Sequence, residues 1–89
     1  MDDRLARRPE GIELNALSES VFVILERYTA FPWPVMFAQC KRVGADPAQL
    51  TLDELQLAMP FLVQGVARFT DPLRAQHAGR ELAELVKRR

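Results

Sequence analysis

Apolar side chains recur at intervals of three and four residues through most of this chain, and that spacing is typical of amphipathic helices. The first such stretch spans residues 17–31, in which Ser18 is the expected N-cap. The β-branched run at residues 21–24 would also suit a strand, but no second candidate strand exists to pair with it. We therefore predict a helix, whose apolar stripe consists of Leu17, Val21, Leu25 and Tyr28.

Two prolines mark the boundary between the first and second predicted helices. Pro32 disfavours helical backbone at Phe31 and so ends the first helix. Pro34 acts in the same way on Trp33, and a proline is tolerated in the first turn of a helix, so the second helix should begin at or after Pro34. It should end at Gly44, a residue type that readily terminates helices. Trp33 is then expected in an extended conformation at the corner, with its ring turned inward.

The third predicted helix has the clearest start signal in the chain. It follows a short turn at residues 46–50, and Thr51 and Glu54 have the spacing of a capping box. Pro60 removes one backbone hydrogen bond, which predicts a kink or a break. The helix is apolar on two sides, which is typical of a central position in a bundle. One stripe consists of Leu52, Leu55, Met59, Leu62, Val66 and Phe69, and the other side carries Leu57 and Phe61.

The fourth predicted helix begins after Thr70 or Asp71 as N-cap, with Pro72 in its first turn. Gly65 and Gly79 fall inside predicted helices, where glycine costs about 1 kcal/mol relative to alanine. Close approach of a neighbouring helix would account for both. The expected apolar face of the fourth helix is Ala75, Ala78, Leu82, Leu85 and Val86, and the expected outer face is Arg74, His77, Arg80, Glu81 and Glu84.

These elements predict an all-α fold, a small single-domain bundle of four to five short helices with non-parallel packing. A chain of 89 residues has enough apolar side chain for one core only. Residues 14–89 should form the bundle, and residues 1–13, which are charged and lack an apolar stripe, should form a flexible N-terminal tail.

The charge balance narrows the classes of partner. Twelve basic and twelve acidic residues cancel, so no long-range field attracts nucleic acid or acidic lipid. The longest apolar run, residues 21–25, is far shorter than the roughly 20 residues that span a bilayer. The charged N-terminus lacks the apolar segment of a signal peptide. We expect a cytoplasmic protein that does not enter membranes.

The residue types in this chain give little support for catalysis or for metal binding. Cys40 and His77 are the only residues of their kinds and lie on different predicted helices, so a zinc site lacks ligands. We expect Cys40 to be buried as a small hydrophobic side chain. We expect His77 to form a solvent-exposed pair with Glu81, four residues later on the same helix. No glycine-rich phosphate loop is present. We expect no enzyme activity, no metal and no cofactor.

A helix-turn-helix outline at residues 38–56 makes a DNA-binding or transcription-associated domain the alternative function. In that motif the start of the second helix faces phosphates. Here it carries Asp53 and Glu54, which repel phosphate, so nucleic acid is the less favoured partner.

The favoured function is a non-enzymatic protein–protein interaction module, a small adaptor or regulatory protein. Its partner is a protein of unknown identity, and homodimerisation is one form that the interaction could take. Aromatic side chains and arginine are common in the energetic centres of interfaces. The predicted contact surface consists of Trp33, Phe37, Leu57 and Phe61, with Arg68 and Arg74 at its rim.

Overall fold

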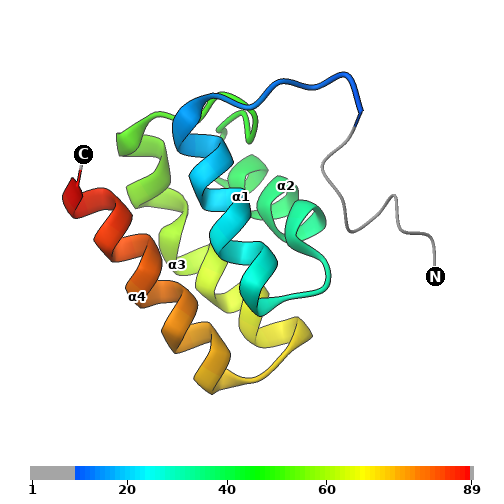
Figure 1. Ribbon diagram of the computed structural model, residues 1–89, viewed down its shortest axis with the longest axis vertical. Coiled ribbons are helices and arrows are strands. Elements are labelled where there is room, and N and C mark those ends of the chain that lie inside the picture. The colour runs from blue at the N-terminus through cyan, green and yellow to red at the C-terminus, as the bar shows by residue number, and fades with distance from the viewer. Residues whose placement is uncertain (1–9, 89) are drawn as a thin grey trace.

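Four α-helices build the computed structural model, which describes residues 10–88 of the chain. Within this range no strand occurs, which confirms the all-α prediction. Residues 1–9 of the expected tail, and Arg89, lie outside the described residues. The helices are α1 (Ala16–Tyr28), α2 (Pro32–Arg42), α3 (Leu52–Phe69) and α4 (Pro72–Arg88) (Figure 1).

The start of α1 lies closer to the N-terminus than predicted. Asn15, not Ser18, is the N-cap, and its Oδ1 accepts a hydrogen bond from the backbone N–H of Ser18 at 2.8 Å. Ser18 is instead fully buried, and its hydroxyl accepts a hydrogen bond from the N–H of Leu50 at 3.0 Å. The Asn15 side chain also donates to the carbonyl of Leu50 at 2.9 Å. Both polar side chains therefore join the start of α1 to the segment before α3.

The prediction that Trp33 is extended was wrong. Helix α2 begins at Pro32, and its first helical hydrogen bond runs from the N–H of Val35 to the carbonyl of Phe31 at 3.2 Å. The first amides of any helix have no acceptor inside it, so both Pro32 and Pro34 fit the first turn without losing a bond. Trp33 lies between them in helical backbone.

The structure of the turn between α2 and α3 agrees with the prediction from its local sequence. Gly44 has a φ of +74°, in the left-handed region, and α2 ends just before it, as predicted. Asp46 then forms a turn by accepting a hydrogen bond from the N–H of Ala48 at 2.9 Å. The predicted capping box is confirmed, because Thr51 Oγ1 accepts from the Glu54 N–H and Glu54 Oε1 accepts from the Thr51 N–H.

Pro60 does not divide the third helix. Helix α3 is continuous from Leu52 to Phe69 with Pro60 inside it, so the bundle has four helices in the described range rather than five. The side chain of Pro60 is exposed, which lets its ring project into solvent rather than into a neighbouring helix. One missing backbone bond is tolerated because packing on both sides holds the helix.

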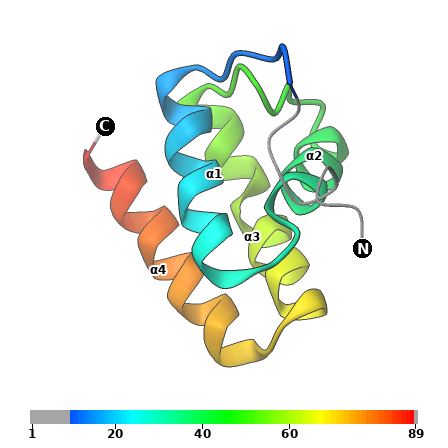
Figure 2. The ribbon, with the colours of Figure 1, turned by 45° about the vertical axis from the view of Figure 1, so that its right-hand side comes forward.

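Helices α1, α3 and α4 form one group, and α2 lies across a side of it (Figure 2). Helix α3 packs mainly against α4 and α2, and α1 packs against α4 and α2. The stripes predicted for α1 and α4 face this core, with Val21, Leu25 and Leu82 fully buried. The stripe of α3 is buried at Leu55, Leu62 and Val66. The residues of α3 that point away from this core are mostly exposed.

Candidate interaction surface

Helix α3 presents a surface without charge over most of its length. Residues 55–67 include no acidic or basic residue, whereas Asp53 precedes them and Arg68 follows them. At 3.6 residues per turn, six residues pointing away from the core fall within an arc of about 100°. Phe61 is half-buried and the other five are exposed. We call these six residues the α3 outer face: Asp53, Leu57, Pro60, Phe61, Gln64 and Arg68.

One edge of the α3 outer face is bordered by α2. The guanidinium carbon of Arg42 lies 4.5 Å from the centre of the Phe61 ring. Nη1 of Arg42 also donates a hydrogen bond to Oε1 of Gln39 at 3.3 Å. The stacked cation covers part of the Phe61 ring and places a positive charge beside an apolar surface. Arg42 is thus a rim residue that sequence reasoning did not select.

Trp33 and Phe37 lie on a different surface from Leu57 and Phe61. Trp33 and Arg42 are nine residues apart in α2, which is two and a half turns, so they point to opposite sides of the helix. Trp33 is partly buried against the core, with its ring centre 6.2 Å from that of Phe37. The four apolar residues predicted for one contact surface are therefore divided between two.

A third apolar group lies where α3 ends and α4 begins. Phe69, predicted for the core, is 55% exposed, because the last turn of α3 extends beyond the buried residues. Its ring lies 5.8 Å from that of Phe31. Leu73 nearby is 62% exposed. Arg74, predicted as a rim charge, is at this end too, where Nε lies 3.6 Å from Oδ2 of Asp71, the N-cap residue of α4.

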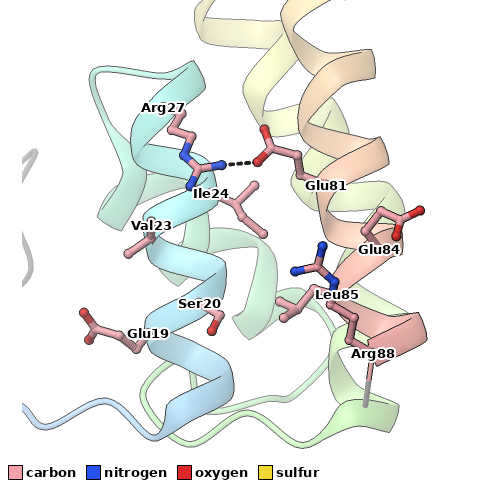
Figure 3. Close-up of a pocket in the computed structure, with 9 residues that line it drawn as sticks. All are labelled: Glu19, Ser20, Val23, Ile24, Arg27, Glu81, Glu84, Leu85 and Arg88. Carbon is pink, nitrogen blue, oxygen red and sulfur yellow. Dashed lines mark hydrogen bonds and ion pairs between the residues drawn. The ribbon is translucent and has the colours of Figure 1, made fainter.

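A groove of about 380 Å³ is lined by side chains of both α1 and α4 (Figure 3). At one end Glu81 of α4 accepts hydrogen bonds from the Arg27 guanidinium and the Tyr28 hydroxyl, both from the end of α1. The bond to Glu81 raises the pKa of Tyr28 above its ordinary value. These contacts join two helices across the groove, so the charges at this end are already paired with one another. The role they indicate is structural.

The predicted pair of His77 with Glu81 was wrong. His77 instead stacks on Tyr28, with ring centres 6.4 Å apart and planes 11° from parallel. Glu81 points toward α1, whose Arg27 and Tyr28 offer two donors at once. Two charge-assisted hydrogen bonds are stronger than one exposed pair within a helix.

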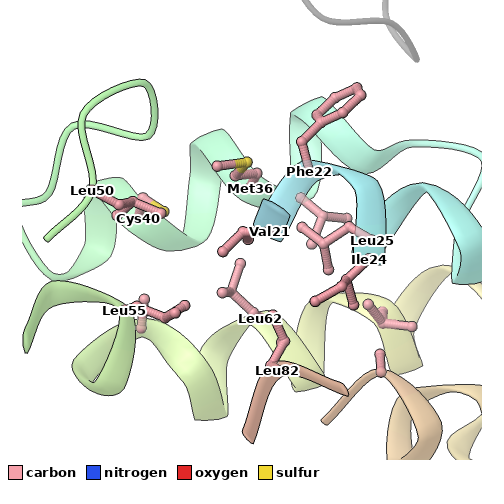
Figure 4. Close-up of a cluster of buried hydrophobic side chains, with 14 of the residues drawn as sticks. Val21, Phe22, Ile24, Leu25, Met36, Cys40, Leu50, Leu55, Leu62 and Leu82 are labelled. Atoms are coloured by element: carbon pink, nitrogen blue, oxygen red, sulfur yellow. The ribbon is translucent and has the colours of Figure 1, made fainter. Parts of the chain in front are cut away.

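Cys40 is completely buried in the core, among the side chains that α2 contributes (Figure 4). Burial raises the pKa of the Cys40 thiol to about 11. A catalytic cysteine needs the thiolate near neutral pH, which this surrounding disfavours. Cys40 therefore acts as a small apolar side chain, as predicted.

Cys40 should react with a thiol reagent far more slowly in the folded protein than in urea. The native rate should keep rising with pH up to about pH 11, where the buried thiol ionises. Between about pH 9 and pH 11 the unfolded chain has lost a proton that the folded protein keeps, so the free energy of unfolding falls with rising pH. Comparison with Cys40→Ala isolates this contribution. Rapid native modification at neutral pH would contradict the buried position.

Two further searches covered residues 10–88 only. No three cysteine, histidine or acidic side chains in this range lie close enough together to hold a metal ion. No helix in the same range is both long enough and apolar enough to cross a membrane.

Sequence reasoning selected Leu57, Phe61 and Arg68 but missed three other members of the α3 outer face. The sequence indicates Asp53 as a helix-start residue that repels phosphate, and Pro60 as the site of a kink or a break. The absence of charge over residues 55–67 was the available signal. Comparisons with protein-family models, curated proteins and solved structures gave no match to this chain.

Proposed function

We propose that this domain is a non-enzymatic protein-interaction module that contacts its partner through the α3 outer face. The observation that carries the proposal is the exposed fraction of Leu57, 62%, in the middle of an uncharged helix surface. Single exposed apolar residues are common and need no explanation. Here Leu57 is continuous with Pro60 and Phe61, which lie one turn further along the same face.

The arrangement of charge around this face supports the same function. The centres of protein interfaces are depleted in charged residues, and their rims are polar and solvent-accessible. The α3 outer face has amide and apolar side chains in its middle, with Asp53 and Arg68 at its two ends. Arg42 adds a positive charge at the α2 edge. An apolar centre with charged ends would favour one orientation of the partner over the other.

Site-specific photo-crosslinking tests this proposal with a matched control. A photoreactive residue replaces Leu57 in one variant and Leu73 in another, because both side chains are 62% exposed. The position-57 variant should give a discrete protein adduct in the cell, and the position-73 variant should not. No adduct at position 57, or equal adducts at both positions, would contradict the proposal.

Acidic side chains at the start of α3 argue against DNA binding as a second function. Asp53 is exposed at the start of α3, where a helix-turn-helix protein would face phosphates. The Glu54 carboxylate also lies at the start of α3, where it accepts the capping-box hydrogen bond from the Thr51 N–H. Both negative charges oppose approach of a phosphate backbone.

A further inference from the structure

We propose that the α3 outer face binds a second copy of this chain, with the two α3 helices antiparallel about a two-fold axis that passes between Pro60 and Phe61. This inference rests on the proposed function, because it names the partner of the same surface. Symmetric dimers are the commonest oligomers, and each subunit contributes the same patch to them.

The two charged ends of the face carry this inference. Asp53 and Arg68 are fifteen residues apart, which is about 22 Å along a helix. Antiparallel pairing places Asp53 opposite the partner's Arg68, and symmetry repeats the contact at the other end. Parallel pairing would place the two Asp53 carboxylates together and the two Arg68 guanidinium groups together. Charge complementarity therefore selects the antiparallel orientation.

The same register accounts for the uncharged residues between those ends. With the axis between residues 60 and 61, Leu57 lies opposite the partner's Gln64. Pro60 lies opposite the partner's Phe61, which brings the apolar side chains together at the centre. The spacing of the six residues along the helix is four, three, one, three and four, which is the same read in either direction. Each of the six positions therefore has a counterpart across the proposed axis, as helical periodicity requires.

Pro60 gives independent support for a contact at the centre of the face. A proline inside a helix removes one backbone hydrogen bond and costs stability. The Pro60 ring is exposed, so packing of the ring in the core does not offset the lost hydrogen bond. In the proposed dimer the ring packs on an aromatic side chain. The chain also has a formal net charge of zero, so no overall repulsion separates two copies.

Sedimentation of the unmodified full chain is the first test. A single-helix interface is small, and small interfaces are weak, so the protein should be examined from roughly 10 μM to about 1 mM. The mean mass should rise from that of the monomer toward twice that value with concentration. Added salt should lower the dimer fraction, because salt screens exposed ion pairs. A constant monomer mass at low salt over this range would overturn the proposal.

Charge reversal with mixing is the second test. Asp53→Arg alone and Arg68→Asp alone should each lower self-association about tenfold, because each places like charges together at both ends. An equimolar mixture of the two variants restores opposite charges at both ends and should recover the dimer. A variant that merely unfolds would not be rescued by mixing. Two folded variants that stay monomeric in the mixture, or that dimerise undiminished alone, would overturn the proposed pairing.

These outcomes separate the inference from the proposed function. A position-57 adduct with a different protein, together with a monomeric chain in sedimentation, would remove the dimer and keep the interaction module. A position-57 adduct of twice the chain mass supports both. No adduct together with a monomeric chain removes both.

Discussion

Replacing Leu62 by alanine is expected to lower the free energy of unfolding by about 2–5 kcal/mol. Leu62 has no exposed surface, and its side chain points from α3 into the core beside Val21 and Leu82 (Figure 4). Alanine would remove three carbon atoms and leave a cavity that the surrounding helices fill only in part. Domains of this size have roughly 5–15 kcal/mol of stability in total, so the loss should be readily visible in urea unfolding followed by circular dichroism.

Leu57→Ala is the matched control for that experiment. It makes the same chemical change in the same helix, but Leu57 is 62% exposed. Changes at surface positions are usually within about 0.5 kcal/mol of zero. Equal losses at the two positions would show that α3 is not oriented as described. A stable Leu57→Ala variant would also be suitable for binding experiments, because any lost interaction would not reflect unfolding.

The four helices could be predicted because their signals are local. Intervals of three and four residues between apolar positions locate the helices, and the capping box at Thr51 involves residues only three apart. Prolines were harder to interpret. A proline early in a helix and one that ends a helix leave the same pattern in a sequence, which is why the extended conformation predicted for Trp33 was wrong. Whether Pro60 breaks its helix depends on packing from other parts of the chain.

The candidate surface could be predicted only in part for a related reason. Helical periodicity places Leu57 and Phe61 opposite the core stripe of their own helix. It does not say how α2 crosses α3, and that crossing separates Trp33 and Phe37 from them. The Arg27 contact with Glu81 joins residues 54 positions apart, so no local pattern indicates it. Ser18 likewise bonds to Leu50 rather than acting as the N-cap within its own helix.

Gly65→Ala is expected to destabilise the protein, although alanine is the better helix former. Gly65 is buried in α3, and a Cβ added there would lie 2.8 Å from Cγ1 of Val35 in α2. The hypothesis that a neighbouring helix approaches this glycine closely is thus confirmed. Val35 is 1% exposed and β-branched, so it has little freedom to move away. Overpacking costs about 1–3 kcal/mol, against roughly 1 kcal/mol gained in helix propensity. Urea unfolding should show a net loss.

A double-mutant cycle identifies the cause of that loss. Val35→Ala removes the obstructing methyl group, so alanine at position 65 should be better tolerated when both changes are present. The coupling should be about 1 kcal/mol or more in the direction of rescue. Gly79→Ala is the second comparison, because its added Cβ would lie 3.2 Å from Cγ2 of the half-buried Val63, which can shift outward. The gain in helix propensity from Gly79→Ala should then offset the cost of the close contact with Val63. Additive losses at positions 35 and 65 would contradict the direct contact of α2 with α3.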